Sequence, residues 1–96
     1  MTKKLVSKVR VKNRLGLHTR PATAIVKLLQ NFKSDVHFTH KRETVNAKSI
    51  LSILMLAARK NSSITITVDG EDAESTLESL VNAFENEFEE KDQKSF

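Results

Sequence analysis

Cysteine, tryptophan and tyrosine are absent from this chain of 96 residues, which contains only two glycines and one proline. Without cysteine, neither a disulfide framework nor a thiolate metal site can form. Two glycines are too few for a Gly-rich phosphate-binding loop, and the sequence shows no paired carboxylates or nucleophile triad. A chain of this length forms one domain with a modest core and no deep catalytic cavity, so any chemistry is expected at the surface.

Long apolar segments are missing as well. The longest uninterrupted apolar run, residues 53–58, has six residues, whereas a helix needs about 20 to cross a bilayer. The first eight residues include three lysines and lack the apolar core of a signal peptide. Together with the absence of cysteine, which suits a reducing compartment, these features predict a cytoplasmic protein that does not insert into membranes.

Charge is distributed unevenly along the chain. Residues 1–60 contain fourteen lysines and arginines and two acids, whereas residues 61–96 contain two lysines and ten acids. The formal net charge of +4 therefore conceals two regions of opposite sign. This asymmetry predicts a basic face for an acidic partner and an acidic face that points elsewhere, although charges that merely balance across the fold would give the same pattern.

Hydrophobic periodicity predicts four strands and three helices. Apolar residues that alternate indicate strands, and apolar residues at helical spacing indicate helices, the first from the vicinity of His18 to about Phe32. The predicted strands cover residues 5–12, 35–40, 44–47 and 62–68, and the two later helices cover residues 50–59 and 71–88. Because residues 41–43 contain no glycine, the connection there is predicted to be longer than a two-residue turn.

The order β-α-β-β-α-β-α predicts an α+β fold with helices on one face of an antiparallel sheet. The pattern alone allows a ferredoxin-like strand order equally well. We assign residues 1–88 to one domain. Residues 89–96 are polar, charged and without periodicity, and they are expected to form a frayed C-terminal tail.

The most informative stretch is residues 16–22, Gly-Leu-His-Thr-Arg-Pro-Ala. Pro21 belongs in a first helical turn, because its φ is preset and it has no N–H to leave unsatisfied. His18 therefore lies at a helix N-terminus, where free amides and the macrodipole favour an anion. Arg20 adds a guanidinium suited to phosphate oxygens. Since neutral imidazole is nucleophilic near pH 7, this cluster predicts phosphoryl transfer to His18.

This stretch resembles the active-site signature of HPr, the histidine-containing phosphocarrier of the bacterial phosphoenolpyruvate-dependent sugar phosphotransferase system. Residues 45–50, Val-Asn-Ala-Lys-Ser-Ile, are similar to a second motif of that family, and the order of elements matches over most of the chain. The resemblance implies an open-faced β-sandwich with strand order 1-4-2-3 and three helices on one face. The chain departs from the family at residues 41–43, where many members carry Asn-Gly.

The resemblance further implies that His18 accepts phosphate on Nδ1 from phospho-enzyme I and passes it to an enzyme IIA domain, with Arg20 stabilising the phosphate. The protein would then be a carrier and not an enzyme, without a cofactor or a metal. A surface site suits this role, since a carrier that bound its phosphoryl group too tightly could not release it. A carrier of a regulatory branch that transports no sugar would use His18 in the same way.

The predicted helix over residues 50–59 is apolar over more of its circumference than packing on one sheet requires. One arc contains Ile53, Leu56 and Ala57, and the other contains Ile50, Leu51, Leu54 and Met55. The resemblance implies that the second arc docks on partner proteins, beside Thr19, Arg20, Lys27 and Lys48. We expect a monomer; a helix buried in a dimer interface is the alternative.

Ser49 is expected to be the N-cap of the same helix. The resemblance implies that this serine is also a regulatory phosphorylation site where an HPr serine kinase/phosphorylase is present. Phosphate is tolerated at a helix N-terminus, but its negative charge beside the docking surface would repel an acidic partner. Phosphorylation of Ser49 is therefore predicted to weaken transfer from enzyme I without unfolding the domain.

The other two histidines and the basic charge of the chain are weaker signs of other functions. His37 and His40 lie on or beside a predicted strand without nearby cysteine or clustered carboxylates, and we interpret them as surface histidines and not metal ligands. The basic first two thirds of the chain would suit a nucleic-acid-binding module. That alternative lacks an aromatic stacking platform, because four of the five phenylalanines lie at core-periodic positions, and we expect no nucleic-acid partner. An assembly protein that uses residues 50–59 as its interface is the second alternative.

Overall fold

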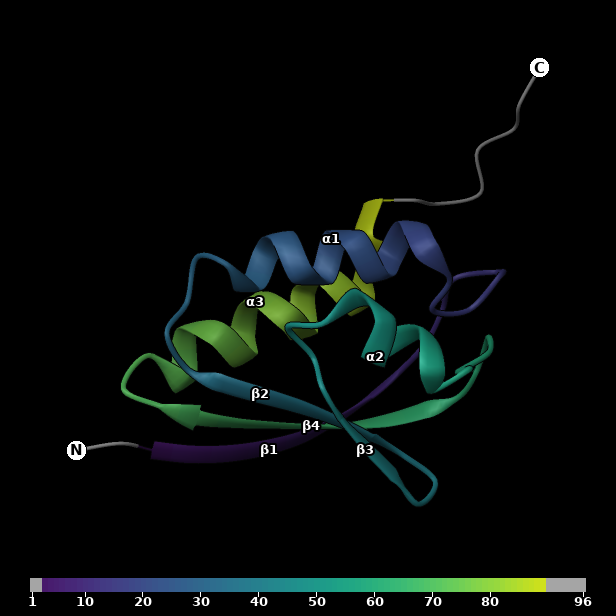
Figure 1. Cartoon of the computed structure of the whole chain (residues 1–96). Helices are drawn as coiled ribbons and strands as arrows, with labels where there is room; N and C mark the ends of the chain where they lie inside the picture. Colours follow the sequence, from purple (N-terminus) through teal and green to yellow (C-terminus); the bar gives the residue numbers. More distant parts are fainter. Residues whose placement is uncertain (1–2, 90–96) are drawn as a thin grey trace.

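The computed structural model describes residues 3–89, in which a four-stranded sheet carries its helices on one face (Figure 1). The strands are β1 (Lys3–Arg10), β2 (Asp35–His40), β3 (Glu43–Asn46) and β4 (Ser63–Gly70). The helices are α1 (Thr19–Leu29), α2 (Ile50–Met55) and α3 (Ala73–Glu85), followed by a 3-10 turn, η1 (Glu87–Glu89). The element order and the α+β class are those predicted from the sequence.

The sheet is antiparallel throughout, with the order β1-β4-β2-β3. This order confirms the open-faced sandwich and rules out the ferredoxin-like arrangement that the pattern alone allowed. Along β4, Ile64, Ile66 and Val68 are buried under the helices, while the residues between them are more exposed. One face of the sheet therefore packs on the core and the other meets solvent.

The core draws on every element that covers the sheet. Phe38 of β2 meets Phe84 of α3 edge to face, with ring centroids 5.7 Å apart, and Phe88 of η1 packs on Phe84 at 4.9 Å. Ile25 and Leu29 of α1 are fully buried, as the helical spacing predicts. This packing fixes α1, and hence the residue at its N-terminus, against the sheet.

The helices end earlier than predicted. The expectation that α2 continues to about Arg59 is wrong: the helix ends at Met55, and Ala57 adopts a left-handed φ of 50° that a right-handed α-helix cannot contain. In the same way α1 ends at Leu29 and not at about Phe32, where hydrogen bonds between residues three apart tighten the exit. α3 ends at Glu85, so Phe88 belongs to η1. The left-handed residue at position 57 is not a glycine, which is why the sequence did not reveal the end of α2.

The connection between β2 and β3 is a two-residue turn, contrary to the longer loop that was predicted. His40 pairs with Glu43, which leaves only Lys41 and Arg42 between the strands. Lys41 has a φ of 58°, in the positive region that two-residue hairpin turns use at their first central residue. A lysine adopts this conformation at a cost of about 1 kcal/mol, which the pairing of the two strands offsets.

The strand bounds differ from the predicted ranges by one or two residues, and the inward-facing residues remain the same. None of the helices within residues 3–89 is long and apolar enough to cross a membrane. The tail expected over residues 89–96 lies outside the described residues apart from Glu89, which ends η1. The boundary at residue 88 therefore stays a prediction.

Asp72, just before α3, joins that helix to the connection between α1 and β2. Its carboxylate accepts hydrogen bonds from the backbone N–H groups of Lys33 (2.8 Å) and Ser34 (3.0 Å) and from the Ser34 hydroxyl. These bonds, led by that of the Ser34 hydroxyl, lower the pKa of Asp72 from the ordinary 3.8 to about 2. The acidic start of α3 thus holds two segments together in addition to complementing the helix dipole.

Candidate phosphoryl-transfer site

His18 lies at the N-cap of α1, in an extended conformation with φ −83° and ψ −166°. Its carbonyl accepts the first helical hydrogen bond, from the N–H of Ala22 at 3.0 Å. The N–H groups of Thr19 and Arg20 belong to the first turn and have no acceptor within the helix. Pro21, the third helical residue, has no N–H at all, as predicted. The ring of His18 is therefore carried by the end of the helix that favours an anion.

The loop before His18 is held by a close backbone contact. Gly16 adopts a left-handed φ of 72°, and its N–H donates to the carbonyl of Asn13 at 3.0 Å. A Cβ at position 16 would lie 2.3 Å from the carbonyl oxygen of Ala58. The N–H of Leu17 donates to the same oxygen at 3.0 Å. Gly16 thus permits a close approach of two backbone segments, and the residue it approaches lies just beyond α2.

The same loop is also attached to the end of α3. The buried Asn13 side chain donates from Nδ2 to the carbonyl of Glu87 at 2.9 Å. On the surface nearby, Lys12 and Glu85 form an ion pair of 2.7 Å. No local pattern pointed to a role for Asn13, because its partner Glu87 lies in η1, which was not predicted. The loop that carries His18 is thus fixed from both sides.

The imidazole of His18 is only partly open to solvent. The side chain is half-buried, and its Nε2 atom is buried. Thr19 and Arg20, the next two residues, are exposed. The half-buried ring is therefore followed directly by two exposed residues of the first helical turn.

The exposed part of α2 forms an apolar surface that we call the α2 patch. It consists of Ile50, Leu51 and Met55, which are 37%, 68% and 70% exposed. Ile53 and Leu56 on the opposite side are buried, as predicted. Two residues differ from the predicted arcs. Leu54 is half-buried against the core, and Ala57 is exposed because the helix has ended before it.

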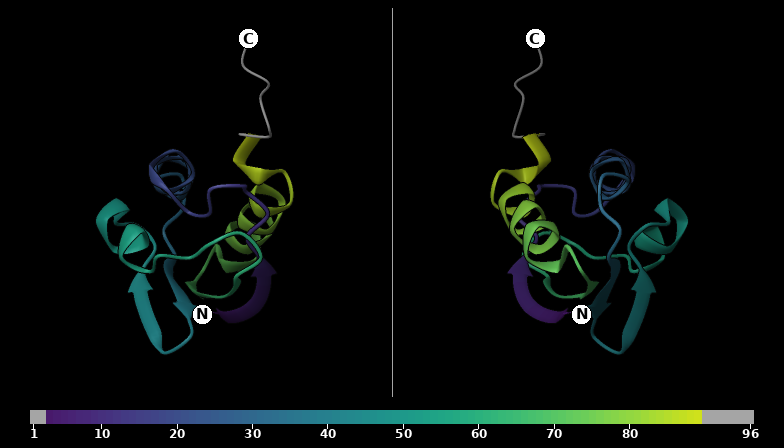
Figure 2. Two further views of the ribbon diagram at one scale, coloured as in Figure 1. Left: turned by 90° about the vertical axis from the view of Figure 1, so that its right-hand side faces the viewer. Right: turned by 90° about the vertical axis from the view of Figure 1, so that its left-hand side faces the viewer.

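The surroundings of the α2 patch are basic. Figure 2 shows α1 and α2 side by side, with α3 on the other flank of α1. Lys27 is exposed in the last turn of α1, and Lys48 is half-buried, with its Nζ donating to the carbonyl of Phe32 at 3.1 Å. Ser49 is the N-cap that was predicted, since its Oγ accepts from the N–H of Ser52 at 3.2 Å. The structure thus brings the predicted docking residues onto one side of the molecule.

One exposed apolar residue of this region was not predicted from the sequence. Leu15 lies in the loop three residues before His18 and is 65% exposed. Its position next to a glycine in a predicted turn could have indicated that it is exposed. Hydrophobic periodicity predicts burial only for residues within helices and strands. The hydrogen bond from Leu17 to Ala58 places its loop against the segment that follows α2.

The other two histidines belong to β2. His37 is exposed on the open face of the sheet, and His40 is half-buried with its Nδ1 3.3 Å from the carbonyl of Leu56. Within residues 3–89, no group of three or more histidines, aspartates and glutamates has a geometry that could hold a metal ion.

Known proteins resemble the chain over most of its length. The family model described as the PTS HPr component phosphorylation site matches residues 5–86. The phosphocarrier protein HPr of Chlamydia pneumoniae is 45% identical over 78 residues, which cover 81% of this chain and 72% of that protein. An HPr from Thermoanaerobacter tengcongensis superimposes with a TM-score of 0.86 at 31% identity, covering 91% of this chain and 98% of that one. HPr from Bacillus anthracis gives a TM-score of 0.79 at 40% identity, covering 82% and 94%.

These likenesses agree with the two sequence motifs and with the strand order. They identify a protein that carries a phosphoryl group and does not act as a catalyst. The chain belongs to the HPr family, the phosphocarrier proteins of the bacterial phosphotransferase system (PTS).

Proposed function

We propose that the phosphoryl group is carried on the Nδ1 atom of His18. The observation that supports this assignment is the position of the ring at the N-cap of α1, together with the burial of Nε2, which removes that nitrogen from solvent. The lone pair of Nδ1 attacks the phosphorus of the donor. The bond from phosphorus to Nδ1 forms as the bond to the donor's leaving group breaks.

Arg20 and the first turn of α1 stabilise the phosphoryl group after transfer. The N–H groups of Thr19 and Arg20 point out of the helix N-terminus, and the Arg20 guanidinium adds a charge-assisted donor. Both residues are exposed, so water competes for the phosphate oxygens. Stabilisation therefore stays moderate, as a carrier requires for passing the group on.

The α2 patch and its basic neighbours dock the protein on its donor, enzyme I, and on its acceptor, an enzyme IIA domain. Leu51 and Met55 offer the largest exposed apolar surface, and Lys27 and Lys48 add positive charge beside it. Ile50 and Thr19 contribute at the margins, whereas Leu54 contributes less because it is half-buried. We add Leu15 to this surface on the strength of its exposure next to His18.

We propose that Ser49 is a regulatory site for an HPr serine kinase/phosphorylase where the cell contains one. Its Oγ lies at the start of α2, directly beside the α2 patch. A phosphate there would be tolerated by the helix N-terminus and would place negative charge at the docking surface.

The relay operates in the cytoplasm, and the protein works as a monomer, because partners need the α2 patch uncovered. Three solved neighbours are described as dimers, an HPr from Thermoanaerobacter tengcongensis and two structures of Crh from Bacillus subtilis. Sedimentation at increasing concentration tests the monomer proposal. A dimer that covers α2 would contradict it.

The first experiment incubates the chain with phosphoenolpyruvate and enzyme I and measures intact mass before and after brief acid treatment. We expect one phosphate that is labile to acid and absent from the His18→Ala variant. Nuclear magnetic resonance of the phosphorylated chain distinguishes Nδ1 from Nε2. A stable phosphate, or one retained by His18→Ala, would contradict the proposal, provided that enzyme I is active on a known carrier.

A further inference from the structure

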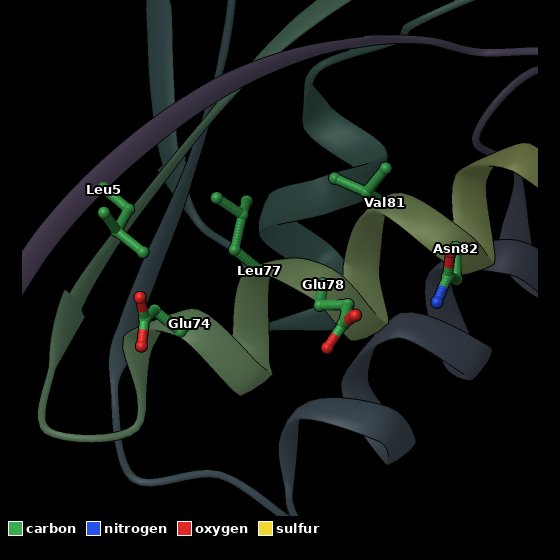
Figure 3. Close-up of a pocket in the computed structure, with 6 residues that line it drawn as sticks. All are labelled: Leu5, Glu74, Leu77, Glu78, Val81 and Asn82. Carbon is green, nitrogen blue, oxygen red and sulfur yellow. The ribbon is translucent and has the colours of Figure 1, made fainter.

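A groove runs between β1 and α3, on the flank of the molecule opposite α2 (Figure 2). It has a volume of about 410 Å³ and is lined by three apolar and three polar residues, shown in Figure 3. We call it the β1–α3 groove and define it by Leu5, Leu77, Val81, Glu74, Glu78 and Asn82. The apolar residues are half-buried, whereas the polar ones are exposed. The groove therefore has an apolar floor and an acidic rim.

The charges around the groove are only partly compensated within the chain. Lys3 pairs with Glu74 at 3.2 Å at one end of α3, and Lys12 pairs with Glu85 at 2.7 Å at the other. Glu78 lies between these two pairs and has no cation within ion-pair distance among residues 3–89. The middle of the rim thus offers a carboxylate to a cation from outside.

The groove borders an open edge of the sheet. β1 has eight residues and pairs with β4 alone, so its other edge faces no strand in the described part of the chain. The backbone groups along such an edge are a template for a strand from another molecule. Proteins that bind extended peptides in this way take affinity from main-chain hydrogen bonds and specificity from alternate side chains.

We propose that β1 and the β1–α3 groove bind an extended segment of a partner protein that alternates apolar and basic side chains on one face. The segment adds a fifth strand beside β1. Its apolar side chain covers Leu5, Leu77 and Val81, and a lysine or arginine next to it pairs with Glu78. The acidic rim selects a partner segment with positive charge. The apolar floor selects a segment that also has an apolar side chain, which a simple cation lacks.

A second copy of this chain fits the groove poorly. Two β1 strands side by side would bring together their outward residues Lys4, Lys8 and Arg10, which carry the same charge. On the inward side of β1 the alternation leaves one cation, Lys3, which already pairs with Glu74 of its own chain. Charge complementarity therefore favours a different protein.

The β1–α3 groove and the α2 patch lie on opposite flanks of α1 and have neighbours of opposite charge. A partner in the groove consequently leaves His18 accessible, and binding there is independent of the phosphoryl transfer proposed above. The same molecule could hold a phosphotransfer partner and a groove partner together.

The test is a titration of the 15N-labelled full chain with a seven-residue peptide, acetyl-Thr-Lys-Thr-Leu-Thr-Lys-Thr-amide, followed by nuclear magnetic resonance. We expect saturable shifts at millimolar peptide, confined to the amides of β1 and of residues 74–82. The Glu78→Lys variant should bind the peptide roughly five-fold more weakly, since an exposed ion pair is replaced by repulsion. A matched variant, Glu43→Lys, changes the same charge at the β3 edge of the sheet and should bind as the parent does.

Three results would overturn the proposal. One is the absence of saturable shifts up to millimolar peptide. Another is equal binding of a peptide in which both lysines are replaced by glutamate, which would show that charge does not select the segment. The third is a set of shifts at residues 16–22 and α2, which would place the peptide on the other face. Because Glu78 and Glu43 are exposed, both variants are expected to fold as the parent does.

Discussion

The face formed by α1 and α2 leaves charged and apolar side chains open to solvent, whereas the flank formed by α3 pairs several of its charges within the chain. On the first, Leu51 and Met55 stand open to solvent, and neither of the two ion pairs found within residues 3–89 involves Arg20 or Lys27. On the second, Lys3 and Lys12 pair with acids of α3, and Asp72 accepts three hydrogen bonds from Lys33 and Ser34.

This difference separates groups that act within the fold from groups left for a partner. Charges that are satisfied inside the chain hold α3 in place, whereas under the function proposed above the open cations beside α2 would steer an acidic partner toward His18. If this division is correct, changes on the α1–α2 face should alter phosphoryl transfer more than stability. Matched changes near α3 should do the reverse.

The largest effect on transfer is expected from Gly16→Ala. The added Cβ would meet the carbonyl oxygen of Ala58 at 2.3 Å, and the left-handed φ of 72° disfavours alanine. Displacement of the loop should slow phosphorylation by enzyme I by about 100-fold, since small misplacements of reacting groups are costly. Gly70→Ala is the control: its Cβ would lie 2.4 Å from the Ser34 hydroxyl, so it should destabilise the fold while the folded protein transfers normally. Time courses of phosphorylation and urea unfolding of both variants test this prediction. Equal transfer rates for the two variants would contradict it.

Leu51→Asp should weaken docking by about 30-fold, as truncation or reversal of a central interface residue does. The matched variant is Val6→Asp, which introduces the same charge at a residue 59% exposed on the open face of the sheet. We expect transfer from enzyme I to fall only for Leu51→Asp, measured as the dependence of initial rate on carrier concentration. A similar loss in both variants would mean that net charge, and not the α2 patch, controls docking.

Ser49→Asp should slow transfer by about 10-fold while leaving the fold intact, because aspartate caps a helix as well as serine does. Ser49→Asn keeps the cap without the charge and serves as the neutral control. Thermal unfolding should place both variants within about 0.5 kcal/mol of the parent. Transfer by Ser49→Asp at the native rate would remove the electrostatic argument for regulation at this position.

The smallest effect on transfer is expected from Asp72→Asn, which acts on stability alone. Because folding lowers the pKa of Asp72 from 3.8 to about 2, its stabilising contribution is complete above pH 4 and is lost as the pH falls through about 2. The variant should therefore be less stable than the parent at pH 7, and the two should converge near pH 2. Urea unfolding across this range measures the gap, and a gap that does not change with pH would refute the assignment.

Features set by neighbouring residues were predictable from the sequence. Pro21 and Gly16 act through their own backbone preferences, so the sequence alone places His18 at a helix N-terminus. Ser49 could be assigned as an N-cap for the same reason, and the alternation of β4 identified its buried face. Strand order was different: the pattern allowed two arrangements, and only the family resemblance selected 1-4-2-3.

Features imposed by distant contacts were missed. Lys41 and Ala57 have a positive φ although neither is a glycine, so the sequence does not mark them as left-handed. The pairing of β2 with β3 holds Lys41 in this conformation, and the segment that contains Ala57 packs against residues 16–17. Asn13 is buried and donates to the carbonyl of Glu87, 74 residues away, and Leu15 is exposed in the loop that contains Gly16. Each of these features depends on contacts between different segments of the chain, which local sequence patterns do not show.

The pairing of β1 with β4 also means that a newly synthesised chain can complete its sheet only late in synthesis. Lys3 pairs with Gly70, and Val11 exchanges hydrogen bonds with Asn61 and Ser62, so the first strand finds its partner only after most of the chain has left the ribosome. The loop before His18 likewise waits for Ala58. Until then the segment around His18 lacks its native support, so under the function proposed above the topology would delay phosphoryl transfer until synthesis is nearly finished.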